Sequence, residues 1–217
     1  MTNKFPVPIY QTITIDAADA VSIASLITAA ATKTAAQATP VLGEIEVLLD
    51  NGNLTATATD RFMAATYSST ATGEDAAFRL TAAAAKFLTA NVKRVNKHYD
   101  TPPVLFVIDQ DARQVTISHG GATFMDTWNA AKFPAILDAM INEWQPADLA
   151  QPVKLRGEFL ARLYKFTDAF VRVDYWVLEL GSAKSAFRPD RPGPVLATAG
   201  KFRVMIQPNI YQAGDTI

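Results

Sequence analysis

The chain has 217 residues and a net charge of −1, with 49% hydrophobic and 19% charged residues. These values fit a folded globular protein and exclude a disordered chain, but they leave room for a basic stripe on one face. The sequence has no cysteine and two histidines, which excludes disulfides, thiolate chemistry, cysteine-based zinc sites and a typical histidine-rich metal centre.

The first segment predicts a strand, a helix and three strands. Gln11–Ile15 alternates in polarity as a strand does, and Asp16 is a good N-cap for the helix that follows. The apolar side of that helix carries Ala20, Ile23, Ala24, Ile27 and Ala31, and its opposite, weakly polar side carries Ser22, Ser25, Ala29, Thr32 and Lys33. The strands are Gly43–Leu49, Leu54–Ala58 and Phe62–Tyr67, with a hairpin signal at Asn51-Gly52.

The second segment repeats this order. A strand over Ala77–Leu80 leads to Thr81, which caps a helix that reaches about Asn96. One side of the helix carries Ala84, Leu88, Val92, Val95 and Tyr99, and the side nearly opposite carries Lys86, Lys93 and Lys97. Strands follow over Val104–Ile108, Val115–Ser118 and Thr123–Trp128, and after Phe133-Pro134 a short helical segment ends near Trp144.

The third segment shows the same order after a linker over Gln145–Gln151. It predicts a strand over Val153–Leu155, a helix with Phe159, Leu160, Leu163 and Phe166, and strands over Trp176–Leu180, Val195–Thr198 and Phe202–Ile206. The three strand-to-helix junctions are spaced by about 65 and 75 residues, which indicates copies of one supersecondary unit. We therefore expect an α+β fold of repeated βαβββ half-domains. Residues 1–144 would form one domain from two half-domains (about 10–72 and 76–144), residues 152–209 a third, unpaired half-domain, and residues 210–217 a tail.

The lysines of the second helix are the clearest functional signal. They would face outward from a helix packed on a sheet, where point charges can contact DNA phosphates without reading sequence. The candidate cations are Lys86, Lys93, Arg94 and Lys97 on the second helix, Arg162 and Lys165 on the third, and Lys33 on the first. Such a weak positive field suits loose, sliding contact with a duplex, although an ordinary solvated helix face shows the same pattern.

Catalytic motifs find no support in the sequence. Ser118-His119-Gly120 is compatible with a small hydrolase but lacks the Gly-x-Ser-x-Gly elbow. Asp60 and Arg61 fit a turn with a surface ion pair, which contributes little. No phosphate-binding glycine loop or metal-ligand motif is present, so we expect a binding scaffold and neither catalytic nor metal-binding residues.

Three strings, in this order, resemble bacterial sliding clamps, the β subunit of DNA polymerase III. They are LLDNGNLTATATDRFMAATY, AKFPAIL and GPVLATAGKFRVMIQPN. The first is similar to a clamp hairpin that leads into an Ala-Thr-Asp motif, the second to the Phe-Pro segment that ends the same domain, and the third to the clamp C-terminus. The resemblance covers most of residues 10–209, but the chain has length for about one and a half of the three clamp domains. It therefore looks like a shortened, phage-like version.

The resemblance implies a processivity factor that is not an enzyme, needs no cofactor and encircles duplex DNA, with helices inside the ring and antiparallel sheets outside. The implied partners are DNA, a DNA polymerase, other clamp-binding proteins and an ATP-dependent loader. An apolar cleft for partner peptides is implied as well. Carried over to this chain, that cleft is lined by Thr59, Met63, Pro134, Met205, Ile206 and Pro208.

An odd number of half-domains predicts a homo-oligomer, either a dimer or a tetramer. The third half-domain would leave an apolar helix flank exposed, and a partner would cover it. That flank comprises Phe159, Leu163, Phe166 and Phe170. A two-fold dimer would pair two such half-domains, and four chains would supply the roughly twelve half-domains of a ring.

Other functions stay open at this point. The chain could be a monomeric adaptor or decoy that binds replication proteins without encircling DNA, a small hydrolase that uses Ser118 or His119, or a structural protein of a virion. The N-terminal segment has no signal-peptide pattern and no apolar run is long enough to cross a membrane, so we expect a cytoplasmic protein of a bacterium or of its phage.

Overall fold

The structure is a computed structural model that describes residues 10–30, 33–95, 101–134, 144, 155–167, 176–181 and 193–207; at 33–35, 93–95 and 167 it describes the backbone alone. Three units follow one another along the chain. The first unit contains β1 (Tyr10–Ile15), α1 (Ala17–Ser25), the 3-10 turn η1 (Leu26–Thr28), α2 (Lys33–Ala38), the 3-10 turn η2 (Pro40–Gly43), β2 (Ile45–Asp50), β3 (Asn53–Thr59) and β4 (Met63–Thr70).

The second and third units repeat this plan. After the short β5 (Thr72–Gly73), the second unit contains β6 (Ala76–Leu80), α3 (Ala82–Val95), β7 (Val104–Asp109), β8 (Gln114–His119) and β9 (Ala122–Thr127). The described part of the third unit contains α5 (Gly157–Thr167), β10 (Val177–Leu180), β11 (Val195–Ala199) and β12 (Phe202–Ile206). Of the predicted strand Val153–Leu155, the structure describes Leu155 alone, which lies in no strand, and residues 135–143 of the predicted helical segment after Pro134 lie outside the described residues.

The strands form two antiparallel sheets, and each of the first two units contributes one strand to the sheet of the other. The five-stranded sheet has the order β5-β1-β7-β8-β9, and the seven-stranded sheet has the order β10-β11-β12-β4-β3-β2-β6. Strand β1 of the first unit pairs with β7 of the second, and β6 of the second pairs with β2 of the first. The third unit joins the first, because β12 pairs with β4 from Phe202↔Tyr67 to Ile206↔Met63. The expected α+β repeat is confirmed.

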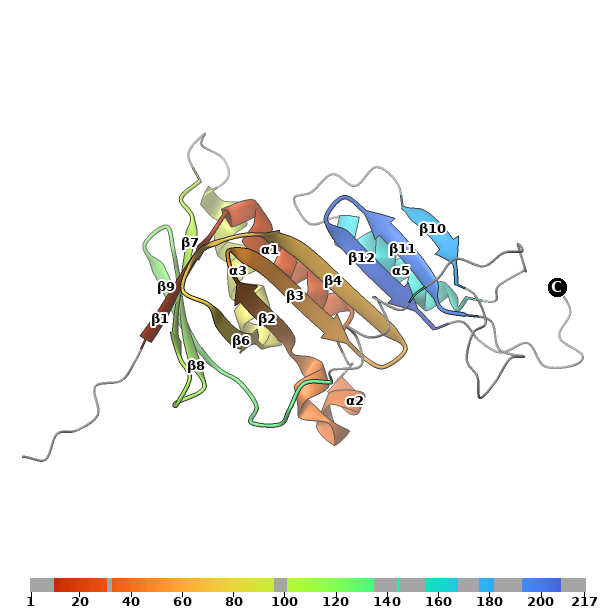
Figure 1. The fold of residues 1–217 in the computed structure, drawn as a ribbon, viewed down its shortest axis with the longest axis horizontal. Helices are drawn as coiled ribbons and strands as arrows, with labels where there is room; N and C mark the ends of the chain where they lie inside the picture. Colours follow the sequence, from red (N-terminus) through yellow and green to blue (C-terminus); the bar gives the residue numbers. More distant parts are fainter. Residues whose placement is uncertain are drawn as a thin grey trace, which may run out of the picture.

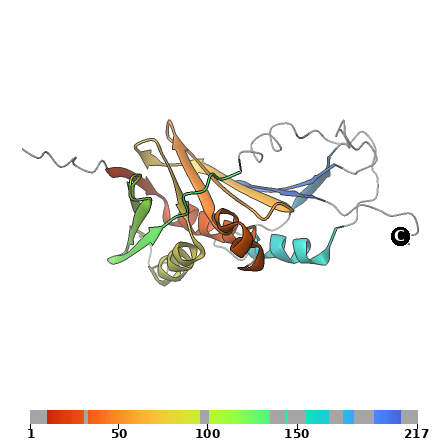
Figure 2. The same cartoon turned by 90° about the horizontal axis from the view of Figure 1, so that it is seen from below.

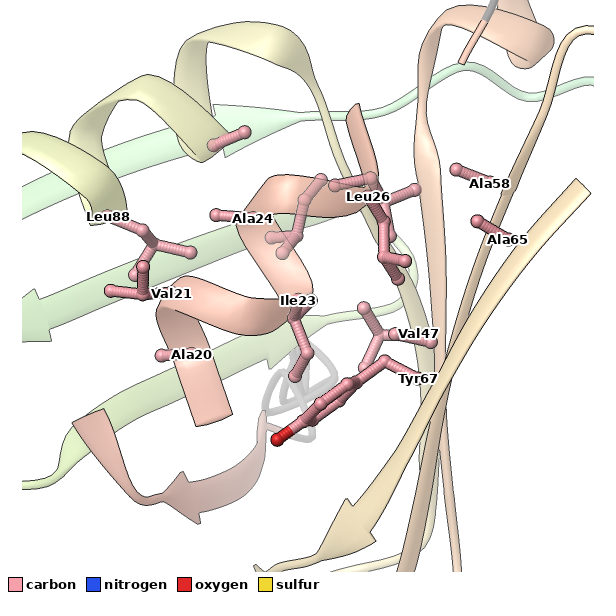
Figure 3. Close-up of a cluster of buried hydrophobic side chains, with 14 of the residues drawn as sticks. Ala20, Val21, Ile23, Ala24, Leu26, Val47, Ala58, Ala65, Tyr67 and Leu88 are labelled. Atoms are coloured by element: carbon pink, nitrogen blue, oxygen red, sulfur yellow. The ribbon is translucent and has the colours of Figure 1, made fainter. Parts of the chain in front are cut away.

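The helices α1, α3 and α5 lie on one side of the two sheets (Figures 1 and 2). Side chains from these helices and from the inner sheet faces form one main core. The close-up of Figure 3 shows Ile23 and Leu26 pointing toward Val47, Ala58, Ala65 and Tyr67, with Val21 facing Leu88 of α3. This layered arrangement leaves the outer faces of α3 and α5 as the free surface of the helix layer.

Helix α1 differs from its prediction in three respects. It ends at Ser25 and gives way to η1, and Asp16 makes no side-chain cap hydrogen bond. The side expected to be polar is buried, since Ser22 and Ala29 both have 0% exposure. The reason is that α1 packs against α3, α5 and β4 at once, so solvent reaches little of its surface. Ser22 satisfies its hydroxyl within the helix by donating to the Ala18 carbonyl at 2.9 Å.

The exposed flank predicted for the third unit is wrong. Phe159 and Leu163 are each 4% exposed and Phe166 is 0% exposed, while Phe170 lies outside the described residues. These side chains are buried because the third unit shares the main core with the first, and Phe166 packs on Phe202 with ring centroids 5.7 Å apart. Leu160 is the exception among the predicted apolar residues of α5, with 49% exposure.

Candidate nucleic-acid and partner surfaces

Helix α3 presents the best-defined part of the predicted cationic face. Thr81 caps it as predicted, because its hydroxyl accepts hydrogen bonds from the amides of Ala83 and Ala84 at 3.1 and 3.5 Å. Ala84, Leu88 and Val92 are buried beneath the helix. Lys86 is exposed and pairs with no acidic side chain among the described residues. Its ammonium group is therefore free to meet an external anion.

For the other cations predicted on this face, the structure gives no side-chain position. Lys93 and Arg94 lie in the last turns of α3, but their side chains are not described, and Lys97 lies outside the described residues. At 100° per residue, Lys86 and Lys93 share one side of the helix. Lys33 begins α2, which packs against η2, and its side chain is likewise not described.

Of the two predicted cations on α5, Lys165 is exposed to solvent and Arg162 forms an ion pair within the protein. Arg162 lies 2.5 Å from the Asp60 carboxylate (Nη1 to Oδ2), and its Nε donates to the Thr28 carbonyl at 2.7 Å. The two side chains of the ion pair are 16% and 11% exposed. Arg162 therefore ties the third unit to the first, and Asp60 pairs with it rather than with Arg61 as predicted.

A second polar contact crosses the same junction between the first and third units. Lys201, in the turn between β11 and β12, lies 3.0 Å from the carboxylate of Asp19 in α1. The same carboxylate accepts the Tyr67 hydroxyl at 2.6 Å. Burial, together with the hydrogen bond to this carboxylate, raises the pKa of Tyr67 well above its ordinary range, so the phenol stays protonated. Both ion pairs fix how the third unit sits on the first.

The residues predicted to line a partner cleft divide between two faces of the seven-stranded sheet. Met63 and Ile206 are opposite each other in the β4–β12 ladder and point into the main core, with 1% and 0% exposure. Met205, their neighbour in the chain, points to the other face, as the strand alternation requires. The structure thus removes Met63 and Ile206 from any surface, and Pro208 lies outside the described residues.

A small apolar cluster covers the outer face at this point. It comprises Val41, Leu42, Ala64, Phe133 and Met205, with Trp144 packed against it. Pro134 follows Phe133 and is partly exposed. Thr59, at 2% exposure, supports the adjoining turn, because its hydroxyl donates to the Met63 carbonyl at 2.9 Å and accepts the Arg61 amide at 3.0 Å. We call the five buried side chains the outer cluster.

Sequence reasoning missed most of the outer cluster and its rim. Phe62 stands beside it at 64% exposure, and its carbonyl accepts the Gln207 amide at 2.8 Å. The indole of Trp144 donates to the Pro194 carbonyl at 3.0 Å. An aromatic residue straight after a tight Asp-Arg turn was the available signal for Phe62. No local pattern could bring Trp144 to this place.

The surroundings of His119 and Ser118 do not support the alternative function of a hydrolase. His119 is 3% exposed, and neither ring nitrogen has a hydrogen-bond partner. The hydroxyl oxygen of Ser118 lies 3.4 Å from that of Thr123. A catalytic histidine needs a nucleophile and an orienting group within hydrogen-bond reach. Among the described residues there is also no group of three or more histidine, aspartate or glutamate side chains placed to hold a metal ion.

Comparison with solved structures settles the fold. The chain superposes on the DNA polymerase III β subunit of Thermotoga maritima with a TM-score of 0.61 and 12% identity, over 93% of this chain and 65% of that one. The β sliding clamp of Caulobacter crescentus gives a TM-score of 0.61 and 13% identity, over 95% and 67%. A putative β subunit from Eubacterium rectale gives 0.62 and 12%, over 93% and 65%.

The chain has the sliding-clamp fold. It spans about two thirds of the length of each of these proteins. No protein-family model and no curated protein matches the sequence. None of the described helices is long and apolar enough to cross a membrane.

Proposed function

We propose that this chain is a sliding-clamp-like processivity factor, without catalytic activity, whose copies encircle duplex DNA with the helix layer inward. The observation that supports this most is the one-sided placement of α1, α3 and α5 behind sheets that run on across units (Figure 2). A helix layer of this kind can line a channel with point charges that contact phosphates and read no sequence. In this proposal the protein is a phage-like clamp of the cytoplasm, and an ATP-dependent loader aids its access to DNA.

The DNA-facing cations in this proposal are Lys86, Lys93 and Arg94 of α3, Lys97, which lies outside the described residues, and Lys165 of α5. Lys33 remains a further candidate. Arg162 is held by Asp60 and Thr28 and therefore contributes by orienting α5. Because most of these charges sit on α3, binding should be weak, non-specific and strongly dependent on salt.

Replication partners, in this proposal, dock a short apolar segment on the sheet side, above the outer cluster. Phe62, Pro134 and Trp144 provide the accessible rim, while Met205 and Thr59 lie beneath it. An aromatic rim around an apolar floor suits capture of a hydrophobic anchor. Pro208, also predicted to line this cleft, lies outside the described residues.

The lysine face can be tested by measuring the binding of a duplex oligonucleotide over a salt series. We expect Lys86→Gln with Lys93→Gln to weaken binding and to reduce the slope of log K against log salt by about 0.9 for each lost phosphate contact. Lys132→Gln is the matched control, because Lys132 is exposed in a segment on the sheet side (Figure 2). An equal loss in the control would contradict the proposed face.

A further inference from the structure

The outer cluster takes its side chains from all three units. Turn η2 and strand β4 of the first unit contribute three of its five side chains, and β12 of the third unit contributes Met205. Phe133 comes from residues 128–134, which lead from β9 of the second unit to the outer face of the seven-stranded sheet (Figure 2). We call these residues the connecting segment. They are all described and lie in no helix or strand, so side-chain contacts have to hold the segment in place.

Arg79 of β6 makes most of the printed contacts that hold the connecting segment. Its side chain is 12% exposed. Its Nη1 donates to the carbonyls of Asn129 and Ala131, at 3.0 and 2.7 Å. The guanidinium carbon also lies 5.7 Å from the centre of the Phe133 ring, within the range of a cation–π contact. One side chain thus contacts the connecting segment at three positions.

Glu44, which directly follows η2, completes this arrangement. Its Oε1 accepts the Asn129 amide at 2.9 Å, and its Oε2 lies 3.7 Å from Nη1 of Arg79. Glu46 lies 3.8 Å from Nε of Arg79 and is opposite it in the β2–β6 ladder, so both side chains are on the outer face of the sheet. The pair of Arg79 and Glu44 therefore ties the connecting segment to η2, and both of these carry residues of the outer cluster.

The connecting segment is also shaped from within. The side-chain oxygen of Asn129 accepts the Ala131 amide at 2.8 Å, a local turn of the kind that asparagine favours. This turn presents the carbonyls of both residues to the same guanidinium group. Phe133 follows at 4% exposure in the outer cluster, and Pro134 is partly exposed beside it. The positions of Phe133 and Pro134 therefore depend on the turn and on Arg79.

We propose that Arg79, paired with Glu44, is a positioning residue for partner docking, which fixes the connecting segment so that Phe133 and Pro134 form one wall of the docking surface. Arg79 acts through these residues, because its own donors are directed to backbone carbonyls. Arginine suits this role, since its planar group keeps its charge when it is buried and presents several donors in a fixed arrangement. The inference rests on the proposed function, because it assigns Arg79 a part in the docking described there.

Methionine methyl groups on the two faces of the sheet provide the test. Met205 lies in the outer cluster, whereas Met63, opposite Ile206 in the β4–β12 ladder, lies in the main core. Spectra of the full chain labelled with ¹³C at the methionine methyl groups are compared with and without millimolar N-acetyl-Leu-Phe-amide as an apolar probe. Met205→Leu and Met63→Leu identify the two signals. In the parent chain, we expect the probe to shift the Met205 signal and to leave the Met63 signal in place.

Arg79→Met removes the donors and the charge and keeps a side chain that can cover the sheet. We expect the Met205 signal to move even without the probe, because the aromatic ring of Phe133 is displaced from it, and its response to the probe to be lost. The Met63 signal should stay in place. A role of Arg79 in general stability alone would not separate the two methyl groups in this way.

Two further variants make this test independent of the folding of Arg79→Met. Asn129→Ala removes the bond to the Ala131 amide outside the sheets and should have the same two effects on the Met205 signal. Arg156→Met is the matched control and should have neither effect. Arg156 is also an arginine near a glutamate, 3.5 Å from Glu158, but it lies directly before α5 and away from the connecting segment.

A Met205 signal that stays in place and still responds to the probe in Arg79→Met and Asn129→Ala would overturn the inference. Equal movement of the Met63 and Met205 signals would overturn it as well, because the change would then be one of general structure. The proposed docking fails separately. A parent chain whose Met205 signal ignores the probe would contradict docking at the outer cluster, while the probe-free spectra of the variants would still show whether Arg79 positions Phe133.

Discussion

Asp60 takes part both in a local turn and in the junction between the first and third units. One carboxylate oxygen accepts the amides of Phe62 and Met63 at 2.9 and 2.7 Å, which shapes the turn before β4. The other oxygen pairs with Arg162 of α5. A single side chain thus connects the local turn to a helix 102 positions further along the chain.

Asp60→Asn should separate these two roles. The asparagine oxygen can still accept the two amides, but the ion pair is lost, leaving Arg162 partly buried without its counter-charge. We expect a loss of about 2 kcal/mol in the free energy of unfolding, below the roughly 3–5 kcal/mol seen for fully buried pairs. Urea unfolding measures this, with the exposed Asp111→Asn as the control. Equal stability of the two variants would show that the ion pair contributes nothing.

Burial of Glu44 makes the free energy of unfolding depend on pH. Its carboxylate accepts the Asn129 amide at 2.9 Å and lies 3.7 Å from Arg79, but burial outweighs these contacts and raises the pKa of the carboxyl. A raised carboxyl pKa in the folded state means that the stabilising contribution of this group is present in acid and is lost as pH rises through that pKa.

Glu44→Gln should therefore gain stability relative to the parent chain as pH rises from below the ordinary glutamate range to neutrality. The glutamine oxygen can still accept the Asn129 amide, so the comparison isolates the cost of the buried charge. Urea unfolding at a series of pH values measures the difference. A difference that stays constant with pH, or shrinks as pH rises, would mean that Arg79 compensates the burial fully.

At the scale of elements, helix α3 begins at a cap residue, Thr81, that can be predicted from the sequence. Its hydroxyl caps α3 and also donates to the Asp126 carboxylate of β9 at 3.0 Å. We expect Thr81→Ala to cost about 1 kcal/mol of stability, the usual value for a lost N-cap, and Thr81→Ser to cost much less because the hydroxyl is kept. Thermal unfolding compares the two, and equal losses would assign the effect to the methyl group instead.

Local features of the elements could be predicted from the sequence, whereas contacts between the units could not. The hairpin at Asn51-Gly52, with φ values of 50° and 77°, and the cap at Thr81 depend on neighbours in the chain, and both are confirmed. The burial of Phe159 and the pairing of Arg162 with Asp60 depend on where the third unit attaches, which no local pattern specifies. The alternation of residues in β4 and β12 likewise cannot predict which face of the sheet a segment distant in sequence covers.

At the scale of the whole molecule, the seven-stranded sheet shows how units of this fold join end to end. Strands β4 and β12 each end their own unit, and they pair with each other. Strand β9 ends the second unit and lies at the edge of the five-stranded sheet within the described residues. A closed ring would need contacts between copies at the outer edges of both sheets, where β9 and β10 lie within the described residues. Symmetric closure of this kind favours an even number of chains.

Encirclement is the central claim, and retention on DNA of different topology tests it most directly. Copies that associate by mass action can close around a plasmid when they are concentrated in its presence at low salt. A ring should then remain on a nicked circular plasmid during a high-salt wash and leave the same plasmid once it is cut to a linear form. Equal release from circular and linear DNA would contradict the account.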